Sequence, residues 1–167
     1  MERIVHNKLM TELLRGKKLN FYQTAYRKHH STEDALFTLC QSIIDGLQSK
    51  PHKKTTVVFL DMTSAFDTVW RGKLIQIAHD MGIQGNALIC ISDFLKNRKI
   101  EVHFNGVYSK KKKRKTWGRV PQGSVLSPLL FLIYLNNIHM LLHEETKVVC
   151  YADDIVIWHT DTNLEQS

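Results

Sequence analysis

The chain has 167 residues, of which 43% are hydrophobic and 23% charged, and its formal net charge is +7. No apolar run approaches the roughly 20 residues that span a bilayer, and the N-terminus lacks the apolar core of a signal peptide. We therefore expect one intracellular domain, or part of a larger one, in the nucleus or the cytoplasm, with nucleic acid as the first partner to consider and no membrane partner.

The N-terminal part is predicted to contain two helices. Residues 2–15 mix apolar and basic positions at helical spacing, and Gly16 ends this helix. A second helix begins after Ser31, whose hydroxyl can cap it, and has acidic residues in its first turn. Residues 50–52, Lys-Pro-His, break this helix. Its expected apolar face comprises Leu36, Leu39, Cys40, Ile43 and Leu47.

A short strand and two further helices are expected next. Residues 55–60, Thr-Thr-Val-Val-Phe-Leu, are the kind of apolar and β-branched run that forms a buried strand, and they lead directly into Asp61. A helix capped by Asp67 is predicted to run to Gly82. Another is predicted over about residues 86–96.

The following segment predicts a hairpin and then an apolar helix. Residues 100–104 alternate apolar and polar positions like a half-buried strand, and Asn105-Gly106 is a strong two-residue hairpin signal. Pro128 opens the helix, whose sequence continues LLFLIYLNNIHMLL. Between the hairpin and this helix lies a run of six cations: Lys110, Lys111, Lys112, Lys113, Arg114 and Lys115.

The last predicted element is a hairpin with carboxylates at its tip. The apolar residues 148–151 and 155–158 flank Ala152, Asp153 and Asp154, so two strands meet around a tight turn. The order of strand, helices, hairpin, helix and hairpin predicts an α+β fold, in which helices cover one face of a mainly antiparallel sheet.

The cysteines do not indicate a cross-linked or metal-bound framework. Cys40, Cys90 and Cys150 lie far apart in apolar contexts, and the sequence has no C-x-x-C pair. We expect all three to be reduced and buried.

Asp61, Asp153 and Asp154 are the candidate catalytic residues. Adjacent like charges beside apolar strands are unfavourable unless something neutralises them. A hard divalent cation does so, and carboxylate oxygens suit Mg²⁺. Two such ions, about 3.5–4 Å apart, clamp the attacking and leaving oxygens of a displacement at phosphorus, in polymerases and nucleases alike. The alternative is that Asp153-Asp154 merely marks a solvated turn.

Three segments resemble motifs A, B and C of reverse transcriptases: VVFLDMTSAFDTV, PQGSVLSPLLFLIYLNNI and YADD. In detail they resemble the non-LTR retrotransposon group, of jockey-like type. QTAYRKHHSTEDAL is similar to that group's fingers motif, and ERIVHNKLM to the helix before it. The resemblance covers nearly the whole chain in family order. It implies that about residues 1–54 are part of the fingers and about residues 55–167 are the palm.

This resemblance implies an RNA-directed DNA polymerase that joins a dNTP to a DNA primer's 3′-hydroxyl on an RNA template. By similarity, Asp61 and Asp153 ligate two Mg²⁺ ions, or Mn²⁺ in their place. Asp154 and the main-chain carbonyl of Met62 are further ligands. An aromatic ring at Phe66 would lie under the sugar and exclude a 2′-hydroxyl; the alternative is a core phenylalanine.

Other matches concern nucleotide and nucleic-acid contacts. Gln122 and Gly123 match the family's nucleotide-contacting pair, where Gln forms hydrogen bonds and Gly permits close approach. Arg27 matches a fingers arginine that would contact template or triphosphate, with a plain surface role as the alternative. The six-cation run lies outside the family's usual pattern. It is a solvated loop, a contact to template or primer phosphates, or a nuclear import signal.

The chain also departs from the family pattern. Ala25, His29 and Arg119 stand where glycines are expected, which bears on the nucleotide pocket rather than on the carboxylates. The thumb and endonuclease regions of a longer polyprotein are not in the sequence, so weak activity or none is expected of this chain alone. Two alternatives are a non-catalytic remnant that at most binds nucleic acid, and a two-metal nuclease, which leaves Phe66 unexplained.

Overall fold

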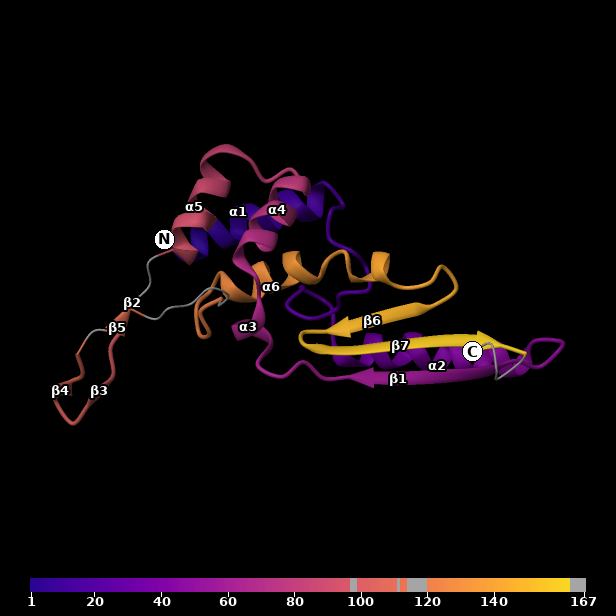
Figure 1. Ribbon diagram of the computed structural model, residues 1–167. Coiled ribbons are helices and arrows are strands. Elements are labelled where there is room, and N and C mark those ends of the chain that lie inside the picture. Colours follow the sequence, from indigo (N-terminus) through magenta and orange to yellow (C-terminus); the bar gives the residue numbers. More distant parts are fainter. Residues whose placement is uncertain (97–98, 111, 114–119, 163–167) are drawn as a thin grey trace.

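The chain forms a three-stranded sheet, a group of helices beside it and a projection made of two pairs of short strands, as Figure 1 shows for the computed structural model. The structure describes residues 1–96, 99–110, 112–113 and 120–162. The helices are α1 (Glu2–Arg15), α2 (Thr32–Gln48), α3 (Ala65–Thr68), α4 (Arg71–Asp80), α5 (Gly85–Leu95), α6 (Ser127–Leu135) and the 3₁₀ helix η1 (Ile138–Leu141). The strands are β1 (Lys54–Leu60), β2 (Lys99–Ile100), β3 (His103–Phe104), β4 (Val107–Tyr108), β5 (Lys112–Lys113), β6 (Lys147–Tyr151) and β7 (Asp154–Asp161).

The sheet has the order β1-β7-β6, and both pairings are antiparallel. Alternation along the strands gives it two apolar faces. Val149 and Trp158 pack with Leu39 of α2 on one face. Cys150 and Ile155 pack on the other, against residues that include Ile138 of η1. Strands of this length become stable when an apolar face is covered, so both layers hold the sheet in place.

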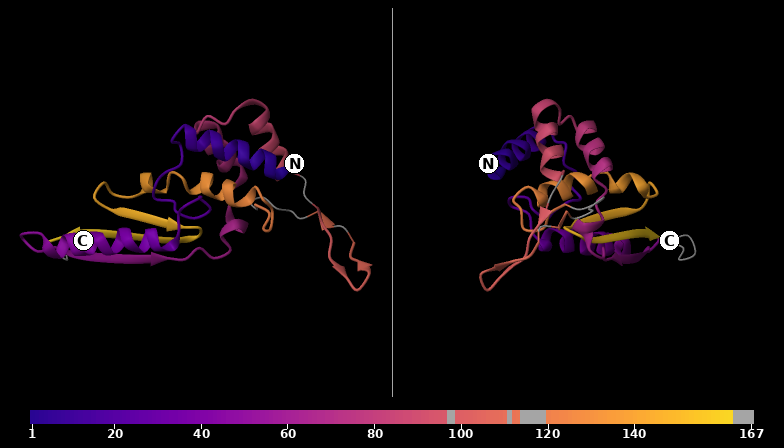
Figure 2. Two further views of the ribbon diagram at one scale, coloured as in Figure 1. Left: turned by 180° about the vertical axis from the view of Figure 1, so that it is seen from behind. Right: turned by 60° about the vertical axis from the view of Figure 1, so that its left-hand side comes forward.

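Helix α2 lies along one face of the sheet. It is behind the strands in Figure 1 and in front of them in the reverse view of Figure 2, and it contacts all three strands. Its start is fixed as the sequence predicts, because the main-chain N–H of Ser31 donates to Asp34 Oδ2 at 2.7 Å in a capping box. The predicted α+β class with an antiparallel sheet is confirmed.

The largest core lies among α1, α4, α5 and α6. Helix α6 is buried almost all round, as expected for a helix that is apolar on every side. Phe131 is 1% exposed and stacks on Phe66, with ring centroids 4.7 Å apart. Through this contact, the helical core reaches the segment that follows β1.

Two predicted helices are each interrupted. The helix predicted from Asp67 to Gly82 is wrong at its start, because α3 and α4 are separate and Asp67 lies inside α3 rather than capping α4. The apolar helix that follows Pro128 ends at Leu135, and η1 follows it. The side chain of Asn136 accepts from the Asn20 N–H at 2.7 Å and donates to a main-chain carbonyl at 3.0 Å. These tertiary bonds accompany the break.

Some apolar positions predicted to be buried are exposed. On α2, Leu36, Leu47 and Cys40 are exposed, so only part of the expected apolar face meets the sheet. Cys150 alone of the three cysteines is buried, while all three are free. The predicted half-buried strand of residues 100–104 is wrong as well, because Phe104 is exposed to solvent. None of the helices in the described ranges combines the length and the apolar content that a bilayer crossing requires.

Candidate active site

The strand register brings two of the predicted carboxylates to one end of the sheet. Leu60, the last residue of β1, pairs with Ile155 of β7. Asp61 therefore follows the end of β1 directly beside the start of β7, which is Asp154. Tyr151 pairs with Asp154 across the hairpin, so Asp153 lies in the two-residue loop between them. The sheet thus places Asp61 beside the hairpin that carries Asp153 and Asp154, although these are remote from it in sequence.

Asp61 and Asp154 line the same hollow, which has a volume of about 340 Å³ and lies between α2 and the end of the sheet. Its walls are mainly apolar, with Leu36, Phe59 and Tyr151 among the lining residues. Asp153 is not among them. It lies near Tyr26 instead: burial raises the pKa of the Tyr26 phenol above its ordinary value of 10.0, and the negative charge of Asp153 adds to this effect.

The carboxylate oxygens have the chemistry that a magnesium ion requires. Among the described residues, no three His, Cys, Asp or Glu side chains are grouped so that they could hold a metal ion by themselves. Mg²⁺ is commonly bound through one or two carboxylates, several waters and the phosphates of a substrate. The pair Asp61 and Asp154, with Asp153 in the adjoining turn, fits such a partly built site.

The turn that carries Asp153 is tight and is held in a left-handed conformation. Ala152 has φ 56°, as a primed two-residue hairpin turn requires at its first loop position. A non-glycine residue in this region costs roughly 1–2 kcal/mol. The pairing of β6 with β7 on one side and contacts from the N-terminal segment on the other hold it there.

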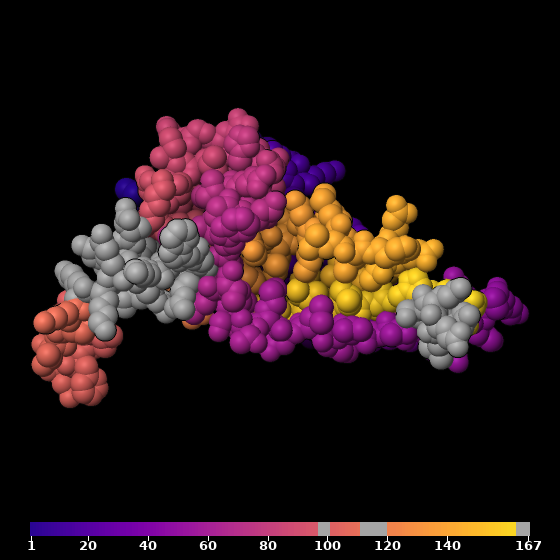
Figure 3. Space-filling model, in the orientation of Figure 1, coloured from indigo at the N-terminus to yellow at the C-terminus, as the bar shows by residue number. Residues whose placement is uncertain are grey.

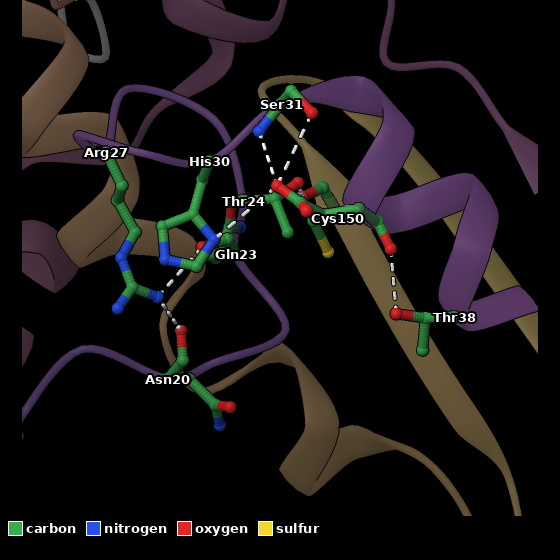
Figure 4. A network of polar contacts seen from close by, with 9 residues as sticks. Asn20, Gln23, Thr24, Arg27, His30, Ser31, Thr38 and Cys150 are labelled. Carbon is green, nitrogen blue, oxygen red and sulfur yellow. Dashed lines mark hydrogen bonds and ion pairs between the residues drawn. The ribbon is translucent and has the colours of Figure 1, made fainter.

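A loop from the N-terminal part of the chain braces the hairpin along the outer side of β6. Cys150 N–H donates to the Tyr22 carbonyl at 2.8 Å, and the N–H and hydroxyl of Thr24 donate to the Cys150 carbonyl at 3.0 and 3.1 Å. Figure 4 shows the Thr24–Cys150 part of this clamp together with Arg27, whose Nη1 donates to the carbonyls of Asn20 and Gln23, each at 3.0 Å. Arg27 thus stabilises the loop in this structure, and its contact to template or triphosphate stays a prediction.

The loop before α6 is anchored to the segment after β1. Val120 N–H donates to the Phe66 carbonyl at 2.9 Å, and the Ser127 hydroxyl donates to the Pro121 carbonyl. Gln122 and Gly123 are exposed between these anchors, and Gly123 has φ +81°, a conformation that any other residue would adopt with strain. The loop is therefore held at its ends, and it leaves Gln122 and Gly123 exposed between them.

Phe66 and Met62 lie at the border between this site and the core. Phe66 is half-buried, with one ring face on Phe131, which accords with either alternative, a core phenylalanine or a residue under the sugar. Met62 is half-buried and packs against two of the core clusters. The Met62 side chain thus anchors the main chain next to Asp61 to the core.

The remaining predicted residues are only partly described. Lys110 is exposed and Lys112 and Lys113 form β5, while Lys111, Arg114, Lys115 and Arg119 lie outside the described residues. Of the positions where glycine was expected, His29 has φ 64°, so histidine adopts a conformation that favours glycine. Ala25 is 2% exposed and packs without a positive φ.

Two interactions that shape the site are not evident from the sequence. Tyr26 lies near Asp153, and nothing in the sequence pattern predicted this. The Glu2 carboxylate accepts from the Val125 N–H at 3.0 Å, which ties the first helix to the loop before α6. In the sequence, Glu2 is an ordinary acidic residue in the first turn of a helix, and only the tertiary fold brings it to the Val125 N–H.

The burial of Cys150 in the sheet can be tested through the pH dependence of stability. Burial raises the pKa of its thiol to about 12, so the unfolded chain ionises at a lower pH than the folded one. Stability is therefore unaffected by this group below about pH 9, and between about pH 9 and 12 it falls by about 1.4 kcal/mol per pH unit. We expect Cys150→Ala to remove that slope in urea unfolding, whereas Cys40→Ala, at an exposed cysteine, keeps it. Equal slopes in all three proteins would contradict this.

Comparison with known proteins gives consistent matches. Residues 1–166 match the family described as "Reverse transcriptase (RNA-dependent DNA polymerase)". The chain is 28% identical over 95% of its length to a "Probable RNA-directed DNA polymerase from transposon BS" of Drosophila melanogaster. It is 29% identical over 100% of its length to an "RNA-directed DNA polymerase from mobile element jockey" of Drosophila funebris. The chain spans 18% of each of these relatives.

A solved structure shares the fold. Apo telomerase from Candida tropicalis, truncated from its C-terminal domain, superposes with a TM-score of 0.66 at 14% sequence identity. The match covers 98% of this chain and 34% of the telomerase chain. At this identity the similarity concerns the arrangement of helices and strands.

Proposed function

The chain belongs to the reverse transcriptase (RNA-dependent DNA polymerase) family, and on this premise we propose that it carries the polymerising centre of a retrotransposon's RNA-directed DNA polymerase. The observation that carries the proposal is the pairing of Leu60 with Ile155, which sets Asp61 beside the hairpin of Asp153 and Asp154. The reaction joins the 3′-oxygen of a DNA primer to the α-phosphorus of a dNTP on an RNA template. The bond to the β-phosphate breaks, and pyrophosphate leaves.

Asp61 and Asp153 are the proposed principal ligands of two divalent cations, Mg²⁺ or Mn²⁺, with Asp154 and the Met62 carbonyl as auxiliary ligands. When bound, such ions neutralise charge on the attacking and leaving oxygens. The chain's own part is to hold its carboxylates in position before substrate arrives. The β6–β7 pairing and the clamp at Cys150 support that role, because they fix the turn from both sides.

Nucleotide selection is assigned to residues on the two anchored segments. Gln122 would hydrogen-bond the incoming nucleotide, and Gly123 would let it approach the main chain. Phe66 would close the space beside C2′ of the sugar. The Phe66–Phe131 stack and the bond from Val120 to Phe66 support this assignment, because they hold the ring and the loop together.

The domain assignment is proposed on the same grounds. Residues 1–54 would be part of the fingers and residues 55–167 the palm. The template, the primer and the remaining regions of a longer polyprotein are the proposed partners, acting inside the cell. The clamp between the loop at Thr24 and strand β6 would then join fingers and palm.

Primer extension tests the proposal. Because the chain spans 18% of the length of the Drosophila funebris jockey polymerase, the assay uses that full-length polymerase with the corresponding segment replaced by this chain. We expect extension of a DNA primer on an RNA template that requires Mg²⁺ and all four dNTPs. A chimera that folds and binds primer–template but adds no nucleotide would contradict the proposal and favour a non-catalytic remnant.

Phe66→Val tests the selection of deoxynucleotides. Removing the ring opens the space for a 2′-hydroxyl, so we expect rNTP incorporation relative to dNTP to rise by roughly 10- to 200-fold, the range for a pocket contact of this size. The measurement is single-nucleotide kcat/KM with each substrate in the chimera. Phe21→Val, at an exposed phenylalanine, is the control and keeps the ratio. An unchanged ratio in Phe66→Val would make Phe66 a core residue only.

A further inference from the structure

Strands β2 to β5 form a slender arm that projects from the body. We define the arm as residues 99–110 and 112–113, and it extends away from the helices in Figures 1 and 2. β2 pairs with β5, and β3 pairs with β4. Within the described residues, these strands contact each other more than they contact any other helix or strand. Figure 3 shows the arm's tip standing clear of the rest of the surface.

The tip is a preorganised turn. Asn105 and Gly106 have φ 47° and 79°, the positive values that a primed two-residue hairpin requires at both central positions. Behind the turn, Phe104 pairs with Val107 and His103 with Tyr108. The arm continues through a hydrogen bond from Ser109 N–H to the Val102 carbonyl at 2.9 Å. Its side chains are thus sorted onto two opposite faces.

The two faces differ in chemistry. Phe104 and Val107 share one face, which is apolar. On the other, the rings of His103 and Tyr108 stack with centroids 4.3 Å apart and an interplanar angle of 22°. Tyr108 is 64% exposed, so a flat aromatic surface faces solvent. Strand alternation places the exposed Lys110 on the same face as Tyr108.

The arm is strongly basic. Residues 99–113 contain five lysines and one glutamate. Proteins bind single-stranded nucleic acids with aromatic side chains that lie beside basic ones, because bases stack on the rings and phosphates pair with the cations. An isolated two-stranded hairpin is at best marginally stable in water, so a ligand that covers it also stabilises it.

We propose that the His103–Tyr108 face of the arm binds a single strand of nucleic acid, with a base stacked on Tyr108 and phosphates against Lys110 and the neighbouring lysines of the arm. The surface is separate from the carboxylate site and needs no catalysis to operate. It rests on the proposed function only in taking the bound strand to be template. The choice of a nucleic acid over a protein partner rests on the charge of the arm.

The test is equilibrium binding of fluorescein-labelled oligouridylate to the chain with Asp153→Ala in the background, in the absence of nucleotides. We expect Tyr108→Ala to weaken binding roughly 5-fold or more, as for the loss of one stacked base. Phe104→Ala, which removes an exposed aromatic ring from the opposite face of the arm, is the matched control and keeps the affinity. Oligothymidylate in parallel shows whether the strand can equally be DNA.

The cations are tested through salt. Changing Lys110, Lys112 and Lys113 together to Gln should reduce the slope of log affinity against log salt by about 2, since each phosphate contact to a single strand contributes about 0.7. The charge-matched control changes Lys28, Lys50 and Lys53 to Gln and keeps more of the slope. Unchanged affinity in Tyr108→Ala, or equal losses in both lysine variants, would overturn the proposal and favour a protein partner or a solvated arm. A chimera that fails to extend primers leaves this binding result unaffected.

Discussion

Replacing Asp153 by asparagine is expected to lower the rate of primer extension by the chimera about 1,000-fold or more. Asparagine keeps the shape of the side chain and removes its charge, so the turn persists while the proposed cation ligand is lost. Metal stabilisation of the transition state is worth several kcal/mol, and about 4 kcal/mol corresponds to this factor. Asp61→Asn should cause a loss of similar size, and measured kcat for single-nucleotide addition is the readout.

The matched control is Asp93→Asn. Asp93 is an exposed aspartate on α5 that pairs with Lys96 at 3.7 Å, so this change removes an equal charge from a distant surface. It should leave kcat within about 2-fold, because exposed ion pairs contribute little. If Asp153→Asn retains the extension rate of the control, the carboxylates are not the catalytic ligands. Thermal melts of both variants check that the fold survives.

The largest expected effect on stability comes from Phe131→Ala. Phe131 is 1% exposed, lies in the buried helix α6 and stacks on Phe66. Truncating a buried phenylalanine costs about 3–5 kcal/mol, because apolar contacts are lost and a cavity remains. Small domains have about 5–15 kcal/mol of stability in total, so this variant should be close to unfolding. Urea unfolding of the chain followed by circular dichroism measures the change.

Phe37→Ala provides the comparison for this loss. Phe37 is 70% exposed on α2, so its truncation removes the same atoms from a site in solvent. We expect a change within about 0.5 kcal/mol, the usual range for surface positions. Equal destabilisation by both variants would mean that α6 is not the centre of the core. Retained stability in Phe131→Ala would have the same meaning.

Much of the fold follows from local patterns. Helix α1 spans the predicted residues, α2 starts after Ser31 as predicted, and β1 and the last hairpin lie where apolar runs predict strands. These elements combine a clear period with a strong local end signal. The sequence also predicts where the aspartates lie, because Asp61 directly follows the apolar run of β1 and Asp153 and Asp154 lie between two apolar runs.

The rest depends on contacts that local patterns do not encode. The apolar helix after Pro128 ends early as Asn136 bonds to the segment at Lys18 and Asn20, which is remote in sequence. Aspartate is a common N-cap residue, yet Asp67 lies within α3, and α4 starts at Arg71. The nearness of Tyr26 to Asp153 arises from the fold of a loop with two left-handed residues, Tyr26 and His29.

The positions of divalent cations in the assembled complex test the proposed carboxylate site most directly. A crystal of the chimera with primer–template, a non-reactive dNTP analogue and Mn²⁺ would give the ion positions from anomalous scattering. We expect two ions about 4 Å apart, both ligated by Asp61 and Asp153. Ions held by only one of these carboxylates, or carboxyl groups too far apart to share a metal ion, would contradict it.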